Sequence, residues 1–326
     1  LHLLVKKNFL IDQINSSKHK QLTTNNSTNK PILCGGIIIF IGIFFFDTDL
    51  FQIQIISFFV LIIGTLSDIN KLNSPKYRIL FQFLIVFLFL LFNGNLAIVD
   101  LRVAFINNIL SIKFIAILFS IFCMLILING SNFLDGLNTL VAGYYILVLT
   151  IIVLTSSQFN LYIDLNIYYL IITISVVFIF NFFNKIYLGD AGSYLISFLT
   201  AFFILDFYSQ NNSVSPYFIC LLLWYPAFEN LFSILRRITS KKNIDKADDD
   251  HLHQMIYRLL IYKNYLNKRY TNTATAMLIN LFNLLIFIFA YKYYFFTEYL
   301  ILIIFFNITV YLLLYFFIKK NFNYLS

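Results

Sequence analysis

Residues 112–138 read IKFIAILFSIFCMLILINGSNFLDGLN, and this stretch decides the fold class. Its first part is an apolar run of about 17 residues, the length that a helix needs to cross about 30 Å of hydrocarbon. Its second part gathers amide, hydroxyl and carboxylate side chains. The stretch therefore predicts a membrane-spanning helix that ends in a polar segment at the membrane surface.

The same alternation recurs along all 326 residues. With 60% hydrophobic and 12% charged residues, the chain has too little polar surface to coat a soluble globule. We predict an all-α, polytopic transmembrane helix bundle that forms one domain over residues 1–326, with a long cytoplasmic loop at 236–272. The ten expected spans are 33–46, 50–66, 77–93, 112–128, 137–155, 165–183, 193–208, 216–235, 273–291 and 297–318.

The first of these spans is short and holds Gly35, Gly36 and Gly42. Small residues let helix backbones approach closely in lipid, so we expect tight packing there. Residues 94–111 carry two charges among apolar residues and predict an external hairpin or a re-entrant segment. The chain opens with Leu1 and a polar, basic stretch over residues 1–31, and we expect a further upstream helix that brings the bundle to eleven.

Basic residues are distributed unevenly between the two sides of the predicted bundle. Of the 23 Lys and Arg residues, all except Arg102, Lys113 and Lys292 lie in alternate segments, which include residues 1–31 and the long loop. The positive-inside rule places those segments in the cytoplasm. The net charge of +8 is thus explained by topology, and without a basic soluble domain we expect no nucleic-acid partner.

Three acids, Asp68, Asp135 and Asp190, stand at predicted cytoplasmic helix ends after the second, fourth and sixth spans. Mg²⁺ favours one or two carboxylates together with phosphate oxygens, so three carboxylates on one face of a bundle indicate a site for a hard cation. The alternative is that each acid is only a solvated loop end.

The residues around Asp135 favour the functional interpretation. Asn129, Asn132 and Asn138 surround this acid in the motif NGSNFLDGLN. Such a cluster can bind a polar substrate, although Asn and Asp can also simply cap the next helix.

The residues around Asp190 form the motif KIYLGDAGSY, which supplies Lys185, Gly189 and Gly192. Glycines permit close approach of the backbone to a ligand, and a helix N-terminus attracts phosphate. The motif therefore indicates an anion-binding turn that carries one acid.

The long loop carries two further pairs, Arg236 with Arg237 and His251 with His253. The arginines can anchor anionic lipid headgroups at the inner leaflet, and two histidines alone make a poor zinc site. Binding of a nucleotide diphosphate explains both pairs at least as well.

The ordered set of motifs resembles the polyprenyl-phosphate N-acetylhexosamine-1-phosphate transferases (glycosyltransferase family 4), which are similar to the phospho-MurNAc-pentapeptide transferase. The motifs are Pro31 with Gly35-Gly36, GTLSD at 64–68, SPKYR at 74–78, NGSNFLDGLN at 129–138, KIYLGDAGSY at 185–194, and WYPAFENLFSILRR at 224–237 with HLH at 251–253.

The resemblance implies transfer of a sugar-1-phosphate from a UDP-sugar to polyprenyl (undecaprenyl) phosphate, with release of UMP and with Mg²⁺ as cofactor. It implies a bacterial inner-membrane enzyme that faces the cytoplasm, begins the assembly of a cell-surface polysaccharide such as O-antigen or teichoic acid, and has membrane lipid as a further partner. Direct attack and a covalent aspartyl-phosphate both stay open, as does a homodimer.

The resemblance also implies roles for the residues in its motifs. Asp190 and Asn132 are expected to hold Mg²⁺, Asp135 to position metal or substrate, and Asp68 to orient or accept a proton near the lipid phosphate. The expected substrate-binding residues are Asn129, Asn132, Asn138, Lys185, Gly189, Gly192, Arg236, Arg237, His251 and His253.

The chain departs from the family pattern at three positions within or next to these motifs. Ser67 stands where many members have the first of two acids, Asn138 replaces a second acid, and Thr139 replaces a glycine. A family asparagine before the Gly-Asp turn corresponds to Asn181 or Asn184, and the spacing leaves both open.

A membrane transporter of a small anionic solute is the rival interpretation. Transporters carry ionisable residues near the bilayer midplane, whereas Glu229 is the only acid clearly within a predicted span. It precedes Arg236 by about 10 Å of helix and so lies nearer the inner interface. This placement favours the enzyme.

Overall fold

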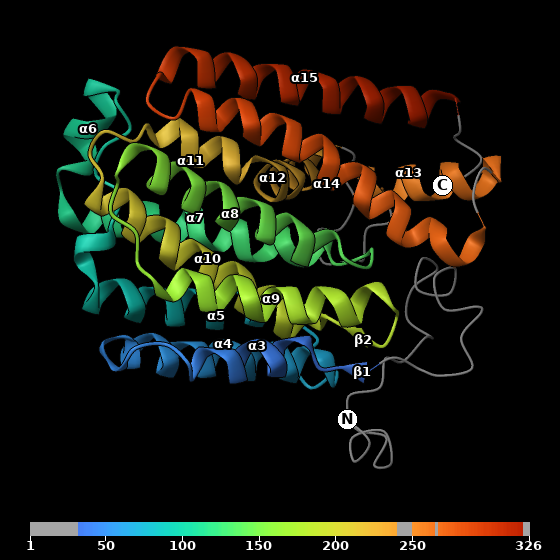
Figure 1. Cartoon of the computed structure of the whole chain (residues 1–326), viewed down its shortest axis with the longest axis horizontal. Helices are drawn as coiled ribbons and strands as arrows, with labels where there is room; N and C mark the ends of the chain where they lie inside the picture. Colours follow the sequence, from blue (N-terminus) through green and yellow to red (C-terminus); the bar gives the residue numbers. More distant parts are fainter. Residues whose placement is uncertain (1–31, 240–249, 265–266, 322–326) are drawn as a thin grey trace.

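The computed structural model describes residues 32–239, 250–264 and 267–321, which form a bundle of roughly aligned helices (Figure 1). The segment 1–31 and the acids Asp248 and Asp249 lie outside the described residues. The α-helices are α3 (Gly35–Ile43), α4 (Phe51–Asp68), α5 (Pro75–Phe92), α6 (Ala104–Leu110), α7 (Lys113–Leu134), α8 (Leu140–Phe159), α9 (Asn166–Phe182), α10 (Gly189–Gln210), α11 (Pro216–Leu222), α12 (Trp224–Thr239), α13 (Leu252–Lys263), α14 (Lys268–Lys292) and α15 (Thr297–Asn321).

Every predicted span contains helix, and the all-α membrane bundle is confirmed. Among the described residues, seven helices are long and apolar enough to cross a membrane, and α11 with α12 gives an eighth if the pair counts as one span. The remaining two predicted spans are shorter, since α9 has 17 residues and α3 has nine. Helix α3 is therefore too short for a full crossing, whereas α9 equals the shortest length that crosses.

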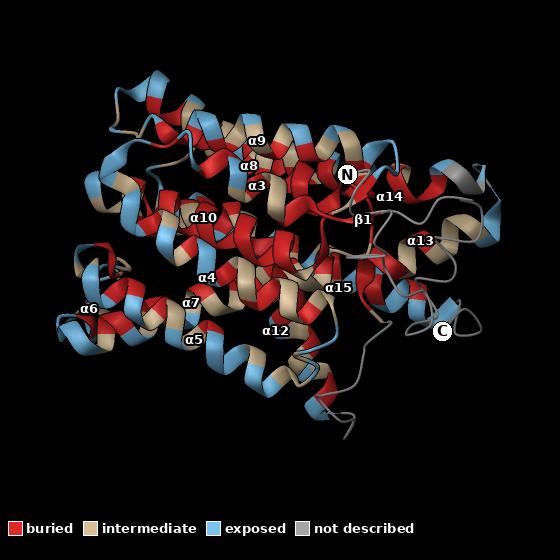
Figure 2. Ribbon diagram, turned by 90° about the horizontal axis from the view of Figure 1, so that it is seen from below, coloured by how far each residue is buried: buried red, intermediate tan, exposed pale blue. Residues whose placement is uncertain are grey.

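Helix α10 forms the centre of the bundle and is buried over most of its length (Figure 2). It packs against α3, α4, α7 and α8. Ser193, Ser197, Thr200 and Ala201 are all buried along it, and such small side chains let neighbouring helices approach closely in lipid. The position of α10 fixes that of Asp190, because this acid is the second residue of the helix.

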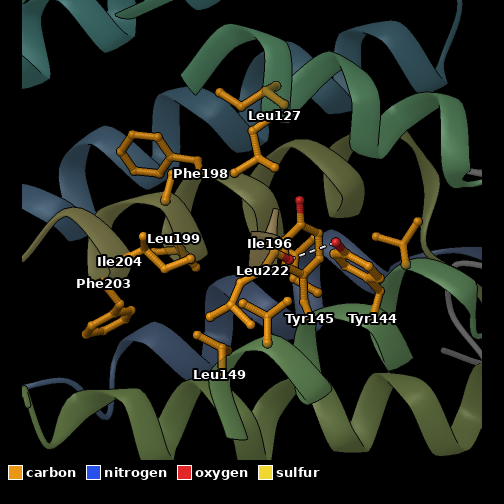
Figure 3. Close-up of a cluster of buried hydrophobic side chains, with 14 of the residues drawn as sticks. Leu127, Tyr144, Tyr145, Leu149, Ile196, Phe198, Leu199, Phe203, Ile204 and Leu222 are labelled. Carbon is orange, nitrogen blue, oxygen red and sulfur yellow. Dashed lines mark hydrogen bonds between the residues drawn. The ribbon is translucent and has the colours of Figure 1, made fainter. Parts of the chain in front are cut away.

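The segment 216–235, predicted as one span, is broken into α11 and α12, which meet at an angle of 74°. In Figure 1, α12 is seen nearly end-on while most other helices lie along the page. Pro226 explains the break, because a proline has no N–H and its ring clashes with the carbonyl four residues earlier, here that of Leu222. The Tyr144 hydroxyl donates a hydrogen bond to that carbonyl at 2.7 Å within the apolar core (Figure 3).

The break gives α12 a polar face toward the interior and an apolar face outward. Glu229, Asn230, Ser233 and Arg237 are buried on it, whereas Leu231, Leu235 and Ile238 are exposed. The kinked helix thus brings polar side chains into the bundle.

Two short strands, β1 (Ile32–Leu33) and β2 (Ile186–Tyr187), pair in parallel directly before α3 and α10. The predicted close packing at the glycines of α3 is confirmed. A Cβ atom on Gly36 would lie 2.7 Å from the backbone carbonyl carbon of Ala191. The start of α10 is therefore held by a strand pair and by a backbone contact with α3.

Between α5 and α7, residues 94–111 form a 3₁₀ turn (Gly94–Leu96) and α6, at the end of the bundle away from β1 and β2 (Figure 1). The Arg102 guanidinium donates hydrogen bonds to the carbonyls of Phe295 at 2.7 Å and Ser213 at 2.8 Å. The segment predicted as a hairpin or re-entrant piece thereby joins two other loops at this end.

Replacing Gly64 with alanine is expected to destabilise the bundle by about 1–3 kcal/mol, the usual cost of overpacking a core. A Cβ atom at this position would lie 2.2 Å from Cα of Ala191, so the first turn of α10 would have to move. The measurement is thermal unfolding of purified protein in detergent. Gly94→Ala is the control, because its nearest contact is the flexible end of the Lys113 side chain, and equal unfolding temperatures for the two variants would contradict the prediction.

Candidate active site

A cavity of about 940 Å³ lies where the polar helix ends meet. Its wall includes the last residue of α4, the last turns of α7, the first turn of α10 and the polar face of α12. Of the residues predicted from the sequence, nine line it: Asp68, Asp135, Asp190, Asn129, Asn132, Asn138, Gly189, Arg237 and His251. Predicted residues from five separate parts of the sequence therefore share one site.

Asp190 is held by three side chains from three other helices or helix ends. One carboxylate oxygen accepts hydrogen bonds from Ser67 Oγ at 2.5 Å and from Arg78 Nη1 at 3.1 Å, and the second accepts from Asn132 Nδ2 at 2.7 Å. Arg78 also donates to Ser67 at 3.0 Å. The hydroxyl of Ser67 thus donates to Asp190 where a second carboxylate would repel it.

Asp68 contacts the backbone of the first turn of α10, which carries Asp190. Its carboxylate accepts hydrogen bonds from the backbone N–H of Asp190 at 2.8 Å and of Ala191 at 3.1 Å. These are two of the N–H groups that a helix N-terminus leaves without an intrahelical partner. Asp68 therefore caps α10 from another helix and fixes the turn that presents Asp190.

Gly189 is required at this turn for two reasons. Its φ of +72° is one that residues with a side chain rarely adopt, and a Cβ atom would lie 2.8 Å from Asp68 Oδ2. Gly192 has a different role, because it packs against Leu188 and the backbone of Gly36 and does not line the cavity.

The residues of the motif NGSNFLDGLN lie partly on a helix, since α7 continues to Leu134. Asn129 donates to Gln82 Oε1 at 2.9 Å on α5, so it joins two helices at the cavity edge. Asp135 follows the end of α7 and lines the cavity. Asn129 and Asn132, which were predicted to lie in a loop, thus belong to the last turns of α7, and Asn138 follows the helix.

The two departures at Asn138 and Thr139 are accommodated by amide side chains. The Asn138 side chain donates to Asn184 Oδ1, and the backbone N–H of Thr139 donates to Asn181 Oδ1. Both candidates for the family asparagine therefore contact this segment. Of the two, only Asn181 is buried, and it lines the cavity.

Thr139 has a φ of +69°, a left-handed conformation that favours glycine. We expect Thr139→Gly to stabilise the protein by about 0.5–1 kcal/mol, because the relief of about 1–2 kcal/mol exceeds the entropic cost of glycine. The control is Asn160→Gly, which has a φ of +52°, since asparagine tolerates this region and should gain less. Unfolding temperatures compare the two, and a loss of stability in Thr139→Gly would contradict the prediction.

The predicted basic residues are divided between the cavity and its surroundings. Arg237 is buried and lines the cavity. Arg236 instead donates to the backbone carbonyl of Asp250 and to the Tyr315 hydroxyl. Lys185 is exposed, with its ammonium 5.9 Å from the centre of the Phe180 ring, and it does not line the cavity.

Of the histidine pair, only His251 lines the cavity. His253 is fully buried, and its Nε2 would lie 3.2 Å from a Cβ atom on Gly136. In the part of the chain that the structure describes, no three His, Cys, Asp or Glu side chains cluster as a metal site would require. The pair thus lacks the further ligands of a zinc site.

The same absence applies to Asp68, Asp135 and Asp190, which line one cavity without forming a three-acid cluster among the described residues, so the expected Mg²⁺ site depends on one or two of them. This ion takes one or two carboxylates and completes its shell with phosphate oxygens and water. The cavity wall offers the carboxylates of Asp190, Asp135 and Asp68 and the amide of Asn132.

Several site residues were not selected from the sequence. Arg78 and Ser67 lie within the motifs at 74–78 and 64–68 and contact Asp190, and Asn230, Gln254 and Asn272 line the cavity. The side chain of Asn272 accepts a hydrogen bond from the backbone N–H of Asn138 at 2.8 Å. Polar residues inside apolar spans were the available signal, because lipid disfavours them unless they face the bundle interior.

The lining of the cavity also includes apolar side chains that are exposed on the outer surface of the bundle. Ile79 on α5 and Phe122 on α7 line it, and these side chains are 47% and 54% exposed. Leu125, Ile126 and Ile234 are further apolar residues of the lining. The site therefore joins a charged pocket to the surface that would contact lipid.

Comparison with known proteins identifies the sequence pattern. Residues 50–208 match the profile of glycosyl transferase family 4. A protein of Bacillus subtilis (strain 168) described as a probable undecaprenyl-phosphate N-acetylglucosaminyl 1-phosphate transferase is 25% identical over 233 residues. The match covers 68% of this chain and 64% of that protein, so the chain spans a little less than two thirds of the relative's length.

Proposed function

We propose that this chain transfers a sugar-1-phosphate from a UDP-sugar to a polyprenyl phosphate and releases UMP, as its match to the profile of glycosyl transferase family 4 over residues 50–208 suggests. The observation that carries the proposal is the cavity with two kinds of side chain. Acids, amides and arginines line it together with apolar side chains, two of which are exposed on the surface of the bundle. Such a site suits a reaction between a soluble anion and a lipid.

The acceptor enters from the apolar side in this proposal. The polyprenyl tail stays in lipid along Ile79 and Phe122 while its phosphate reaches Lys76 and Arg78, which line the same cavity. A phosphate monoester is already largely dianionic at neutral pH, because its second pKa is about 6. The acceptor therefore needs positioning among cationic side chains more than deprotonation.

The donor occupies the polar part in this proposal. Arg237 on α12 and His251 directly before α13 line the cavity, as do Asn132 and Asn138. Guanidinium and amide donors stabilise charge that develops on a leaving nucleotide. The same side chains orient the diphosphate toward the acceptor.

Mg²⁺ completes the proposed site, with Asp190 as its main ligand and Asn132 and Asp135 beside it. When bound, the ion would offset the repulsion between the anionic reactants and stabilise the leaving UMP. Ser67, Arg78 and Asn132 hold the Asp190 carboxylate in one orientation before any ligand arrives. An N-acetylhexosamine donor such as UDP-GlcNAc and a place at the start of cell-surface polysaccharide synthesis, at the cytoplasmic face of a bacterial inner membrane, belong to the same proposal.

The test is release of UMP by purified protein supplied with UDP-GlcNAc, polyprenyl phosphate and Mg²⁺. UMP is expected only when the lipid is present, in equal amount to the lipid-linked sugar phosphate. Asp190→Asn serves as the inactive control. Release of UMP without lipid, or transport of an anionic solute into vesicles with no UMP formed, would overturn the proposal.

A further inference from the structure

Glu229 on α12 is a buried acid that lies outside the cavity wall. It is 1% exposed, and two groups contact its carboxylate. Oε1 lies 2.9 Å from Nδ1 of His251, and Oε2 accepts a hydrogen bond from the Tyr311 hydroxyl at 2.8 Å. A carboxylate buried among apolar side chains costs several kcal/mol unless it is paired in this way, so the arrangement needs an explanation.

The His251 ring is fixed on several sides. Its face lies 5.2 Å from the Phe133 ring and 5.6 Å from the His253 ring, between centroids. The contact with Glu229 places the proton of the neutral ring on Nδ1, because a carboxylate can only accept. Nε2 is then the ring nitrogen that remains for a ligand in the cavity.

A second contact holds the same segment at the neighbouring residue. Arg236 donates to the backbone carbonyl of Asp250 and, at 2.7 Å, to the Tyr315 hydroxyl. Tyr311 and Tyr315 are one turn apart on α15, with rings stacked 6.4 Å apart. Two tyrosine hydroxyls of α15 therefore contact charged residues of α12: Tyr311 contacts Glu229, and Tyr315 contacts Arg236. Glu229 in turn contacts His251, and Arg236 contacts Asp250.

We propose that Glu229, supported by Tyr311, is a positioning residue for the donor nucleotide sugar. It acts through His251, whose Nε2 it directs toward the donor, and it does not touch substrate itself. The inference rests on the proposed function, because it takes the cavity ligand to be a UDP-sugar. Residues of α12 and α15 that do not line the cavity thereby orient a residue that does.

The test is a double-mutant cycle with Glu229→Gln and His251→Ala. Each single variant is expected to raise KM for UDP-GlcNAc about tenfold, the scale of one hydrogen bond to a charged group, while KM for polyprenyl phosphate stays within about twofold. The double variant should match His251→Ala, because a residue that acts through another adds nothing once its partner is gone. Calorimetric binding of UDP-GlcNAc gives the same comparison without turnover.

Tyr311→Phe keeps the ring packing and removes only the hydroxyl, so it tests the same network if Glu229→Gln folds poorly. It should raise the donor KM in the wild-type background and not in the His251→Ala background. Glu298→Gln, at an exposed acid at the start of α15, is the matched control. If wild-type protein neither binds UDP-GlcNAc nor releases UMP, the proposed function fails; if it does both but the effects of Glu229→Gln and His251→Ala multiply, the positioning role fails.

Discussion

Asp190→Asn is expected to lower the rate of UMP release by at least about 10²-fold, the scale of losing one strong electrostatic contact to a transition state. The substitution keeps the shape of the side chain and removes the charge that attracts a hard cation. It also replaces one carboxylate oxygen with an amide NH₂, which cannot accept from Ser67, Arg78 or Asn132. Both the cation and the orientation of the site are therefore affected.

The measurement is UMP release across a titration of Mg²⁺, with thermal unfolding recorded alongside. Folding should be retained, because Asp190 is partly exposed to the cavity and its backbone N–H is still capped by Asp68. Asp206→Asn is a matched control, since this acid lies near the other end of α10 and does not line the cavity. Turnover near the wild-type value at ordinary Mg²⁺ would assign the metal to Asp135 or Asp68 instead.

Asp68→Ala is expected to have the second largest effect, with activity reduced by about 10²-fold through displacement of Asp190. The variant loses two hydrogen bonds to the first turn of α10. The loss of a helix cap costs about 1–2 kcal/mol, so stability should fall together with activity. Asp68→Asn retains one acceptor oxygen and should lie between alanine and wild type in both properties.

Comparison with Asp190→Asn separates two roles for Asp68. A positioning residue lowers both activity and unfolding temperature when removed, whereas Asp190→Asn should lower activity alone. If Asp68→Ala unfolds like wild type and is still inactive, Asp68 acts directly on the lipid phosphate, as the family resemblance implies. The same pair of measurements on one preparation decides between the two.

The sequence carries a local signal for the bend between α11 and α12 that hydropathy alone does not include. Hydropathy over 216–235 is continuous, and it predicts one span. Pro226 is the signal against it, because a proline inside a helix removes a hydrogen bond and clashes with the preceding turn. Without the bend, Glu229 and Arg237 would lie along a membrane span, and their burial beside the cavity would have no explanation.

The sequence by itself determined the helical bundle, the positions of its spans and the placement of Asp68, Asp135 and Asp190 at helix ends. These features depend on hydropathy and chain length, which are local properties of each segment. The motifs also contain most of the residues that line the cavity.

Only the tertiary structure decided what these side chains contact. Arg78 pairs with Asp190 across 112 positions of sequence, Asp68 caps α10, and Arg236 contacts Tyr315 on α15 while Arg237 lines the cavity. Such contacts depend on how each helix is rotated about its axis and where it packs against its neighbours. Hydropathy leaves that rotation open; in this protein it is set by close backbone contacts at Gly36 and Gly64 and by the break at Pro226.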